Sequence, residues 1–354
     1  MFTIDTSKPV MVTGATGYVA GWIVKGLLEA GATVHAPVRN PDDAAKVKHL
    51  TEIAEASSGT LKLFAADLLA EGSYAEAMDG CATVFHTASP FNINVKDPQK
   101  DLIEPAVKGT ENILEQANKT PSVERVVLTS SCAAIYGDTI DCANAPSGRL
   151  DESVWNTSSS INHNAYSYSK TLAEKAAWKI AEAQSQWKLV VINPSLVIGP
   201  ALQDRPTSES FNILRQMGDG SMKTGAPKWG IGVVDVRDLA QAHLAAGFLP
   251  QANGRNIISA HETTLFDMSQ ELRDTFGADY PIPTRPIPKW LAWLIGPMVG
   301  DGVTRKAVER NVNVPFRADN SKALKELGLS YRPLRTSMEE MFQQMIDSGQ
   351  LRKV

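Results

Sequence analysis

Tyr166 and Lys170 lie four residues apart in the run Tyr-Ser-Tyr-Ser-Lys, a spacing that suits proton transfer. Residues 164–184 are rich in Ala, Lys and Glu and predict a helix, on which side chains at i and i+4 share a face. A free tyrosine ionises near pH ~10, and an ammonium group a few ångströms away favours the phenolate. Tyr168 is a second candidate, but position 172 is leucine, so it has no lysine one turn on. The spacing therefore predicts Tyr166 as the group that protonates an alkoxide.

A hydroxyl group that could polarise a carbonyl is predicted at Ser131. It follows the apolar run 125–129, which predicts a strand, in the sequence Thr129-Ser130-Ser131. A serine at the end of a strand can donate a hydrogen bond to a substrate oxygen. The same serine could instead cap a following helix. Together with Tyr166 and Lys170, it predicts a catalytic set in which a carbonyl receives hydride and then a proton.

A glycine-containing turn at residues 13–20, Thr-Gly-Ala-Thr-Gly-Tyr-Val-Ala, predicts dinucleotide binding. It lies between a predicted strand, 9–13, and a predicted helix, 18–30. Small residues there let backbone N–H groups approach a pyrophosphate, whose charge the start of the helix favours. Ala20 replaces the third glycine of the motif, a change that close helix packing tolerates. The expected contacts are Gly14, Ala15, Thr16, Gly17, Tyr18 and Val19.

The residues after the second predicted strand, 33–38, favour NADPH over NADH. An NAD enzyme usually has Asp or Glu here, which accepts hydrogen bonds from the ribose 2′-hydroxyl. This chain has Arg39 instead, and Lys46 follows on the next helix. A guanidinium group suits a 2′-phosphate, although Asp42 and Asp43 lie nearby.

The composition fits a globular enzyme with a small ligand. The chain has 354 residues, 43% apolar and 21% charged, enough for a substantial core. A net charge of −4 provides no positive field for nucleic acid, and no run is long enough to span a membrane. The three cysteines match neither a disulfide framework nor a metal site. With no signal peptide visible at the start, the expected location is the cytoplasm.

Alternating apolar and amphipathic segments predict an α/β fold, a Rossmann-type doubly wound parallel sheet with a smaller, discontinuous C-terminal substrate lobe. Residues 1–199 with about 232–262 are expected to form the dinucleotide-binding domain. About 200–231 with 263–354, rich in Gly and Pro, are expected to form the substrate lobe, with residues 290–295 in its core. The further strands are predicted at 61–65, 83–86 and 189–192, and the further helices at 42–56 and 97–118.

Several motifs together resemble the extended short-chain dehydrogenases/reductases. They are TGATGYVA, Arg39, Asp67-Leu68, His-Thr-Ala-Ser-Pro at 86–90, LTSS at 128–131, Tyr166-xxx-Lys170 followed by TLAEKAAW, and NPSLVIGP at 193–200. The chain is most similar to the dihydroflavonol 4-reductase, cinnamoyl-CoA reductase and yeast-type aldehyde/ketone reductase group. The resemblance supports Arg39 and Lys46 as the 2′-phosphate site and Lys170 as the ribose contact. It further implies that Asp67 and Leu68 meet the adenine, while Thr87, Ala88, Ser89, Pro194, Ser195, Leu196 and Val197 surround the nicotinamide.

The resemblance to this group of reductases suggests that the substrate is a small aldehyde or ketone. The stretch 163–169, His-Asn-Ala-Tyr-Ser-Tyr-Ser, lacks the Trp, Cys and Gly of the cinnamoyl-CoA reductase signature NWYCYGK, which argues against a CoA thioester. Candidate substrate contacts are Phe91, Cys132 and Trp229, and His86 is expected to make a structural hydrogen bond.

Two other functions remain open at this point. A nucleotide-sugar epimerase or dehydratase shares the turn and the catalytic set but keeps NAD tightly bound, which Arg39 and Lys46 do not favour. A non-catalytic dinucleotide sensor would not need the intact Ser131, Tyr166 and Lys170 set. The sequence leaves the oligomeric state and the physiological direction of the reaction open.

Overall fold

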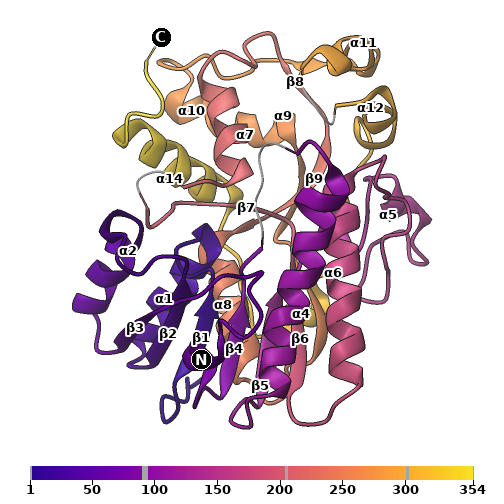
Figure 1. Cartoon of the computed structure of the whole chain (residues 1–354). Helices are drawn as coiled ribbons and strands as arrows, with labels where there is room; N and C mark the ends of the chain where they lie inside the picture. Colours follow the sequence, from indigo (N-terminus) through magenta and orange to yellow (C-terminus); the bar gives the residue numbers. More distant parts are fainter. Residues whose placement is uncertain (1, 90–94, 204–205, 300–302, 354) are drawn as a thin grey trace.

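The computed structural model describes residues 2–89, 95–203, 206–299 and 303–353. In these ranges seven parallel strands form the main sheet, in the order β10-β6-β5-β4-β1-β2-β3 (Figure 1). This order, with crossovers on both sides of β1, confirms the predicted doubly wound α/β class. The strands are β1 (Val10–Thr13), β2 (Thr33–Val38), β3 (Thr60–Ala65), β4 (Thr83–His86), β5 (Arg125–Thr129), β6 (Lys188–Pro194) and β10 (Gly254–Ile258).

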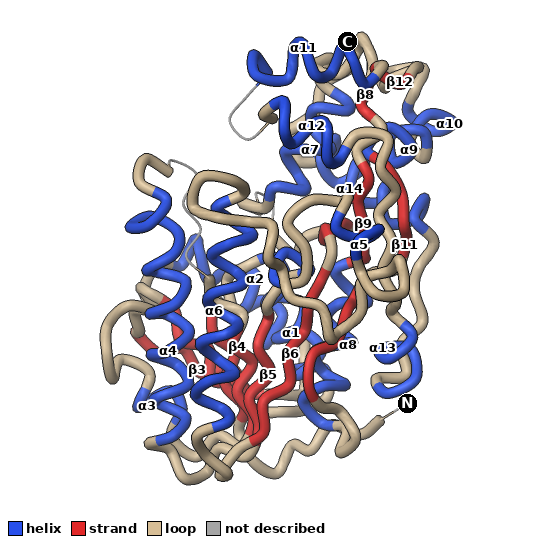
Figure 2. Tube along the Cα trace, turned by 90° about the vertical axis from the view of Figure 1, so that its right-hand side faces the viewer, coloured by secondary structure: helices blue, strands red, loops and turns tan. Residues whose placement is uncertain are grey.

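Helices cover both faces of this sheet (Figure 2). On one face lie α1 (Tyr18–Glu29), α2 (Ala44–Glu55) and α8 (Val236–Phe248), whose apolar side chains share a core with β1, β2 and β6. On the other lie α3 (Ala75–Met78), α4 (Glu104–Asn118) and α6 (Ala165–Glu182). Because both faces are covered, β1, β2, β4 and β5 read as largely apolar runs without alternation, which is why the sequence predicts them well. A π-helical turn, η1 (Gln99–Ile103), leads into α4.

A second lobe lies above the carboxyl ends of the strands (Figure 1). A three-stranded sheet, β7 (Leu196–Ile198), β9 (Gly230–Asp235) and β11 (His261–Thr264), joins it to the main body. Its apolar core contains Phe211, Met268, Met341 and Phe342. The other lobe elements are α7 (Glu209–Gly218), β8 (Ala226–Pro227), α9 (Leu265–Gln270), α10 (Arg273–Phe276), β12 (Pro286–Ile287), α11 (Lys289–Val299), α12 (Arg305–Asn311) and α14 (Leu334–Asp347).

One helix inside the predicted range of this lobe packs elsewhere. The helix α13 (Ser321–Glu326) places Ala323, followed by Leu327, in the main core beside α8 and β10. The chain thus reaches the second lobe after β7, again after β11, and again after α13 in the described residues. The exact domain bounds stay a prediction.

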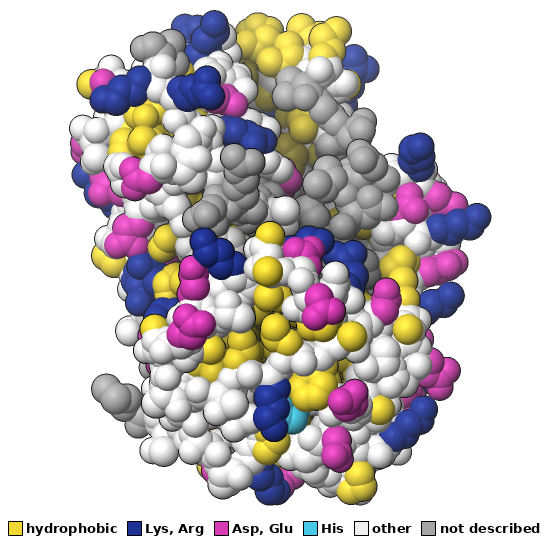
Figure 3. All heavy atoms as spheres, turned by 60° about the vertical axis from the view of Figure 1, so that its left-hand side comes forward, with side chains coloured by type: hydrophobic (Ala, Val, Ile, Leu, Met, Phe, Trp, Pro, Cys, Tyr) yellow, Lys and Arg dark blue, Asp and Glu magenta, His cyan; other side chains and the backbone are white. Residues whose placement is uncertain are grey.

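The apolar helix α11 meets the rest of the protein with one face. Ala292 packs with Val308 and Val312, whereas Trp290, Leu294 and Met298 on the other face are 68%, 52% and 87% exposed. The predicted lobe core at 290–295 is therefore confirmed for one face only. In the part of the chain that the structure describes, no helix is long and apolar enough to cross a membrane. On the face drawn in Figure 3, acidic and basic side chains are interspersed, consistent with the small net charge.

Candidate active site

The glycine turn is tight because two chain segments meet there. Gly14 has φ +65°, and a Cβ at this position would lie 3.0 Å from the Ala88 Cα atom. Its carbonyl accepts a hydrogen bond from the Gly17 N–H at 2.8 Å, directly before α1 begins at Tyr18. A side chain at position 14 would be strained and would push β4's end away. The predicted turn therefore has the geometry that a pyrophosphate-binding loop needs.

Thr13 locks the ends of β1 and β4 together. Its Oγ1 accepts hydrogen bonds from the N–H groups of Thr87 at 3.2 Å and Ala88 at 3.1 Å. With both lone pairs used, its hydroxyl hydrogen is left to donate to the His86 Nδ1 atom, 2.9 Å away. Burial, with a smaller effect of the Lys170 charge, lowers the pKa of His86 to about 3, so the imidazole is neutral. The structural role predicted for His86 is confirmed.

The helix α6 brings Lys170 against the end of β4. The Lys170 ammonium donates to the Ser89 Oγ atom at 3.0 Å and lies 5.9 Å from the centre of the Tyr166 ring. Both side chains occupy one face of the helix, as their spacing predicts. Lys170, Ala88 and Ser89 line a small cavity together with Thr110 and other residues. Two predicted groups of site residues, from β4 and from α6, therefore meet at one place.

Tyr166 extends toward solvent at the start of α6. Its side chain is 51% exposed, and within the described ranges its hydroxyl has no hydrogen-bond partner. The hydroxyl group is thus free to bond to a small molecule. In the described structure the position of the ring therefore depends mainly on the start of α6, with the Lys170 ammonium 5.9 Å from its centre.

Ser131 follows β5 and caps the 3₁₀ turn η2 (Cys132–Ala134). Its Oγ accepts a hydrogen bond from the Ala133 N–H at 3.1 Å, so the capping role considered from the sequence is real. A hydroxyl that accepts one bond can still donate its own hydrogen, so capping does not exclude a contact with a substrate oxygen. Among the described residues no hydrogen bond joins Ser131 to Tyr166.

A buried carboxylate that no sequence motif indicates supports this part of the site. Glu174, one turn after Lys170, is paired with the Arg255 guanidinium at 2.6 Å, and the two side chains are 0% and 6% exposed. Its other donors are Ser130 Oγ, Asn193 Nδ2 and Trp178 Nε1. Arg255 lies on β10, Asn193 lies on β6 and Ser130 directly follows β5. This one side chain therefore fixes α6 against three strands of the sheet. A lysine followed four residues later by a glutamate, as Lys170 and Glu174 are, usually indicates an exposed ion pair on a helix. The sequence therefore carries no signal that Glu174 is buried and anchors α6.

The predicted 2′-phosphate residues lie on the surface beyond β2. Arg39 is exposed and makes no ion pair or hydrogen bond within the described part of the chain. Lys46 Nζ is 3.3 Å from the Asp43 carboxylate, with its side chain 71% exposed. The Arg39 guanidinium is therefore unpaired among the described residues, while Lys46 is shared with an acidic neighbour.

Other predicted cofactor contacts lie after the carboxyl ends of β3 and β6 and at the start of α1. After β3, the Asp67 carboxylate accepts from the Leu69 N–H at 2.8 Å, and Leu68 packs against Gly109 of α4. After β6, the Ser195 N–H donates to the Ile258 carbonyl at 3.1 Å, which ties residues 194–197 to β10. The Tyr18 hydroxyl donates to the Gly199 carbonyl at 2.6 Å, so this side chain joins α1 to the chain beyond β7.

The three candidate substrate contacts have different outcomes. Phe91 lies outside the described residues. Cys132 is 3% exposed and donates to the Asn193 carbonyl at 3.2 Å, and burial raises the pKa of its thiol. This geometry favours the alternative explanation of Cys132 as a small buried residue. Trp229 packs in the cluster of α11 and α12. No cluster of metal-ligating side chains occurs in the ranges that the structure describes.

Comparison with known proteins finds relatives over nearly the whole chain. Residues 10–257 match the model of the NAD dependent epimerase/dehydratase family. Cinnamoyl-CoA reductase CAD2 of Medicago truncatula is 37% identical over 343 residues, 96% of each chain. The bifunctional dihydroflavonol 4-reductase/flavanone 4-reductase of Malus domestica is 34% identical and covers 97% of this chain and 90% of its own. The yeast methylglyoxal/isovaleraldehyde reductase Gre2, solved with NADPH, superposes with a TM-score of 0.76 at 28% identity, over 97% of this chain and 100% of that one.

Proposed function

Since the chain belongs to the NAD dependent epimerase/dehydratase family, as an extended short-chain dehydrogenase/reductase, we propose that it reduces small aldehydes or ketones with NADPH. The resemblance stated from the sequence is thereby confirmed at the level of the family. The observation that carries the proposal is the meeting of Lys170, Ser89 and Tyr166 beside the glycine turn, in a chain that matches reductases along its length. The yeast reductase named for two aldehydes and bound to NADPH supports both the cofactor and the substrate class.

The residues present fit the cofactor. The Gly14 cradle has no room for a Cβ, and Arg39 has a free guanidinium for the 2′-phosphate. Lys170 and Ser89 would hold the nicotinamide ribose, and Pro194 to Val197 would lie over the ring. When bound there, NADPH supplies the hydride.

The side chains of this protein handle the substrate oxygen. Ser131 donates a hydrogen bond to the carbonyl oxygen and stabilises the negative charge that develops on it. Tyr166 then gives its phenolic proton to that oxygen, which forms the alcohol product. The Lys170 ammonium favours the phenolate that remains, because a positive charge nearby stabilises a negative one.

The reductase function is favoured over the epimerase considered above. The two sequence relatives described above, which cover 96% and 97% of this chain, are named as reductases, although the family model also includes epimerases and dehydratases. Epimerases of this fold recycle a bound NAD, whereas Arg39 suits an NADPH that exchanges at each turnover. Protein purified without added cofactor and then denatured should release little NAD; one equivalent of NAD per chain would instead favour the epimerase.

Replacing Arg39 by alanine should weaken the binding of NADPH much more than the binding of NADH. Loss of a charge-assisted hydrogen bond costs about 1.5–3 kcal/mol, so the KM for NADPH should rise by about tenfold or more. The KM for NADH, which lacks the 2′-phosphate, should change much less. Initial rates with each cofactor, followed by nicotinamide absorbance, give both values. Equal losses with the two cofactors would exclude Arg39 as the phosphate contact.

Free carbonyls should be reduced faster than CoA thioesters. The cinnamoyl-CoA reductase relative makes a thioester the second candidate substrate, but residues 163–169 lack that signature. A panel of aldehydes, α-diketones, β-keto esters, flavonoid ketones and a cinnamoyl-type CoA thioester, each at equal concentration with NADPH, separates the two. Turnover of the thioester with all free carbonyls inert would reverse the assignment.

A further inference from the structure

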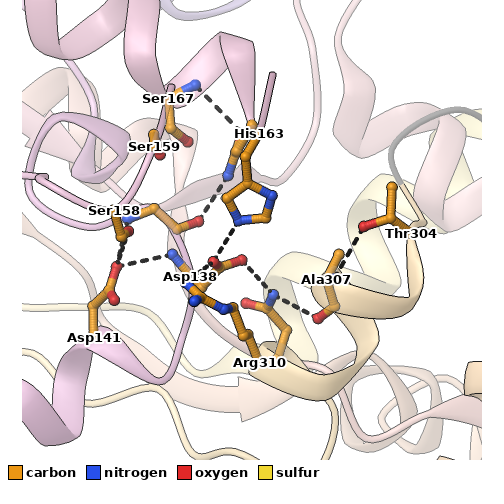
Figure 4. Close-up of polar contacts among 12 residues, drawn as sticks. Asp138, Asp141, Ser158, Ser159, His163, Ser167, Thr304, Ala307 and Arg310 are labelled. Atoms are coloured by element: carbon orange, nitrogen blue, oxygen red, sulfur yellow. Dashed lines mark hydrogen bonds and ion pairs between the residues drawn. The ribbon is translucent and has the colours of Figure 1, made fainter. Parts of the chain in front are cut away.

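A buried carboxylate, Asp138, lies between the second lobe and the helix that carries Tyr166 (Figure 4). Its side chain is 2% exposed and receives three donors. His163 Nε2 lies 2.6 Å and Arg310 Nη1 3.3 Å from Oδ2, and Asn311 Nδ2 lies 2.8 Å from Oδ1. A buried charge is tolerated when such partners surround it. The four side chains therefore form a unit in which each depends on the others.

One side of this unit belongs to the second lobe. Arg310 and Asn311 end α12, which Thr304 caps at its start. The Asn311 Oδ1 atom accepts from both the N–H and the hydroxyl of Thr139, at 2.7 and 2.8 Å, and the Arg310 carbonyl accepts from the Ile140 N–H at 3.0 Å. The end of α12 is thus seated directly on the loop around residue 138.

The other side belongs to the start of α6. Asn164 caps this helix in the left-handed conformation, φ 55° and ψ 59°, which asparagine adopts more readily than most residues. Its Nδ2 donates to the Gly137 carbonyl at 2.7 Å. His163 and Asn164 together bind the Gly137–Asp138 segment, and Tyr166 follows two residues later.

The loop itself is held from below by a second carboxylate. Asp141, at the start of α5 (Asp141–Asn144), accepts from the N–H groups of Gly137 and Asp138 at 2.9 and 3.0 Å and from the Ser158 hydroxyl (Figure 4). The loop therefore has a fixed shape, and a shift of α12 would be passed on to His163.

We propose that Asp138 and His163 are a positioning pair that fixes the first turn of α6, and with it the Tyr166 hydroxyl, onto the docked end of α12. The inference rests on the proposed function, because it assigns Tyr166 as the proton donor. The Tyr166 ring has no hydrogen bond of its own in the described structure, so its position depends on the helix end. A misplacement of about 1 Å can cost on the order of 100-fold in rate. The pair therefore makes proton transfer depend on correct docking of the lobe.

The test compares His163→Ala, His163→Gln and Asn311→Ala with the control His261→Ala. His261 lies on β11 and bonds the Arg332 carbonyl at 2.8 Å, away from α6. His163→Ala should lower kcat by about tenfold or more, with the NADPH Kd unchanged within about twofold. His163→Gln, whose amide can still donate to Asp138, should recover most of the rate. Asn311→Ala, on the lobe side, should lower kcat in the same way, and His261→Ala should not.

A second readout does not need activity. Hydrogen exchange followed by mass spectrometry should speed up at residues 137–141 and 163–170 in both His163→Ala and Asn311→Ala, with thermal unfolding monitored to show that the variants remain folded. Unchanged hydrogen exchange in these segments would overturn the inference. If the parent enzyme reduces carbonyls, a normal kcat in His163→Ala and Asn311→Ala would also overturn it, as would equal losses of kcat and NADPH affinity in these variants. If His163→Ala does not fold, Asn311→Ala is the variant that should lose kcat and exchange faster, and His163→Gln is the variant that should retain both. Faster exchange in a protein that reduces no carbonyl would refute the proposed function and leave the coupling intact.

Discussion

Tyr166→Phe is expected to lower kcat by on the order of 10²–10⁴ while the Kd for NADPH stays nearly the same, the usual range for loss of a general acid. The substitution removes one hydroxyl from a half-exposed ring that has no hydrogen bond in the described structure, so it should not disturb folding. Single-turnover rates and fluorescence titration of NADPH measure the two quantities separately.

Tyr168→Phe is the matched control for this experiment. Side chains two positions apart on an α-helix point some 200° apart around its axis, so Tyr166 and Tyr168 cannot both face Lys170. Tyr168→Phe should leave kcat close to that of the parent. Lys170→Ala should reduce both kcat and NADPH affinity, because its ammonium would contact the ribose and also support the phenolate, and Ser131→Ala should mainly reduce kcat. An inactive Tyr168→Phe beside an active Tyr166→Phe would reverse the assignment of the proton donor.

Glu174→Ala is expected to destabilise the fold by about 3–5 kcal/mol, because it leaves a buried cation without its partner. The Arg255 guanidinium is 6% exposed, and Ser130, Asn193 and Trp178 would lose their acceptor as well. Urea unfolding at neutral pH, followed by tryptophan fluorescence and far-ultraviolet circular dichroism, measures the free energy of unfolding.

The control for Glu174 is a carboxylate in an exposed pair. Glu52 lies 3.6 Å from the Lys48 ammonium on α2, with side chains 60% and 70% exposed. Solvent screens such a pair, so Glu52→Ala should change the free energy of unfolding by less than about 1 kcal/mol. If Glu174→Ala unfolded at the same urea concentration as Glu52→Ala, the buried pair would stabilise the fold no more than the exposed pair does.

The strands that the sequence predicts well are those with a recognisable local apolar pattern. β1, β2, β3, β4 and β5 match their predicted ranges within one residue, although Lys62 interrupts the apolar run of β3. The strand β10, Gly254–Ile258, was not predicted, although it completes the main sheet beside β6. Its apolar pattern is broken by Arg255 and Asn256, both buried. Arg255 pairs with Glu174, 81 residues away, and no local pattern reveals a partner so distant.

The candidate site likewise contains residues that a local sequence pattern predicts and residues that it does not. Tyr166, Lys170 and the glycine turn were predictable because their chemistry depends on short spacings within one helix or one turn. The Asp138 unit was not, because its donors come from residues 163, 310 and 311. Cys132 follows Ser131 directly, yet its thiol turns into the core, since neighbouring residues after a strand do not share a direction.

The interleaved path of the chain has a consequence for directed evolution. Because the chain reaches the second lobe in three separate stretches of the described residues, with β10 and α13 of the main body between them, no single cassette carries the whole lobe. A single gene-shuffling crossover anywhere between β10 and α13 would combine one parent's Ala323 and Leu327 with another parent's β10 and α8. Libraries intended to change substrate preference should therefore avoid single crossovers between β10 and α13, or vary single lobe residues instead.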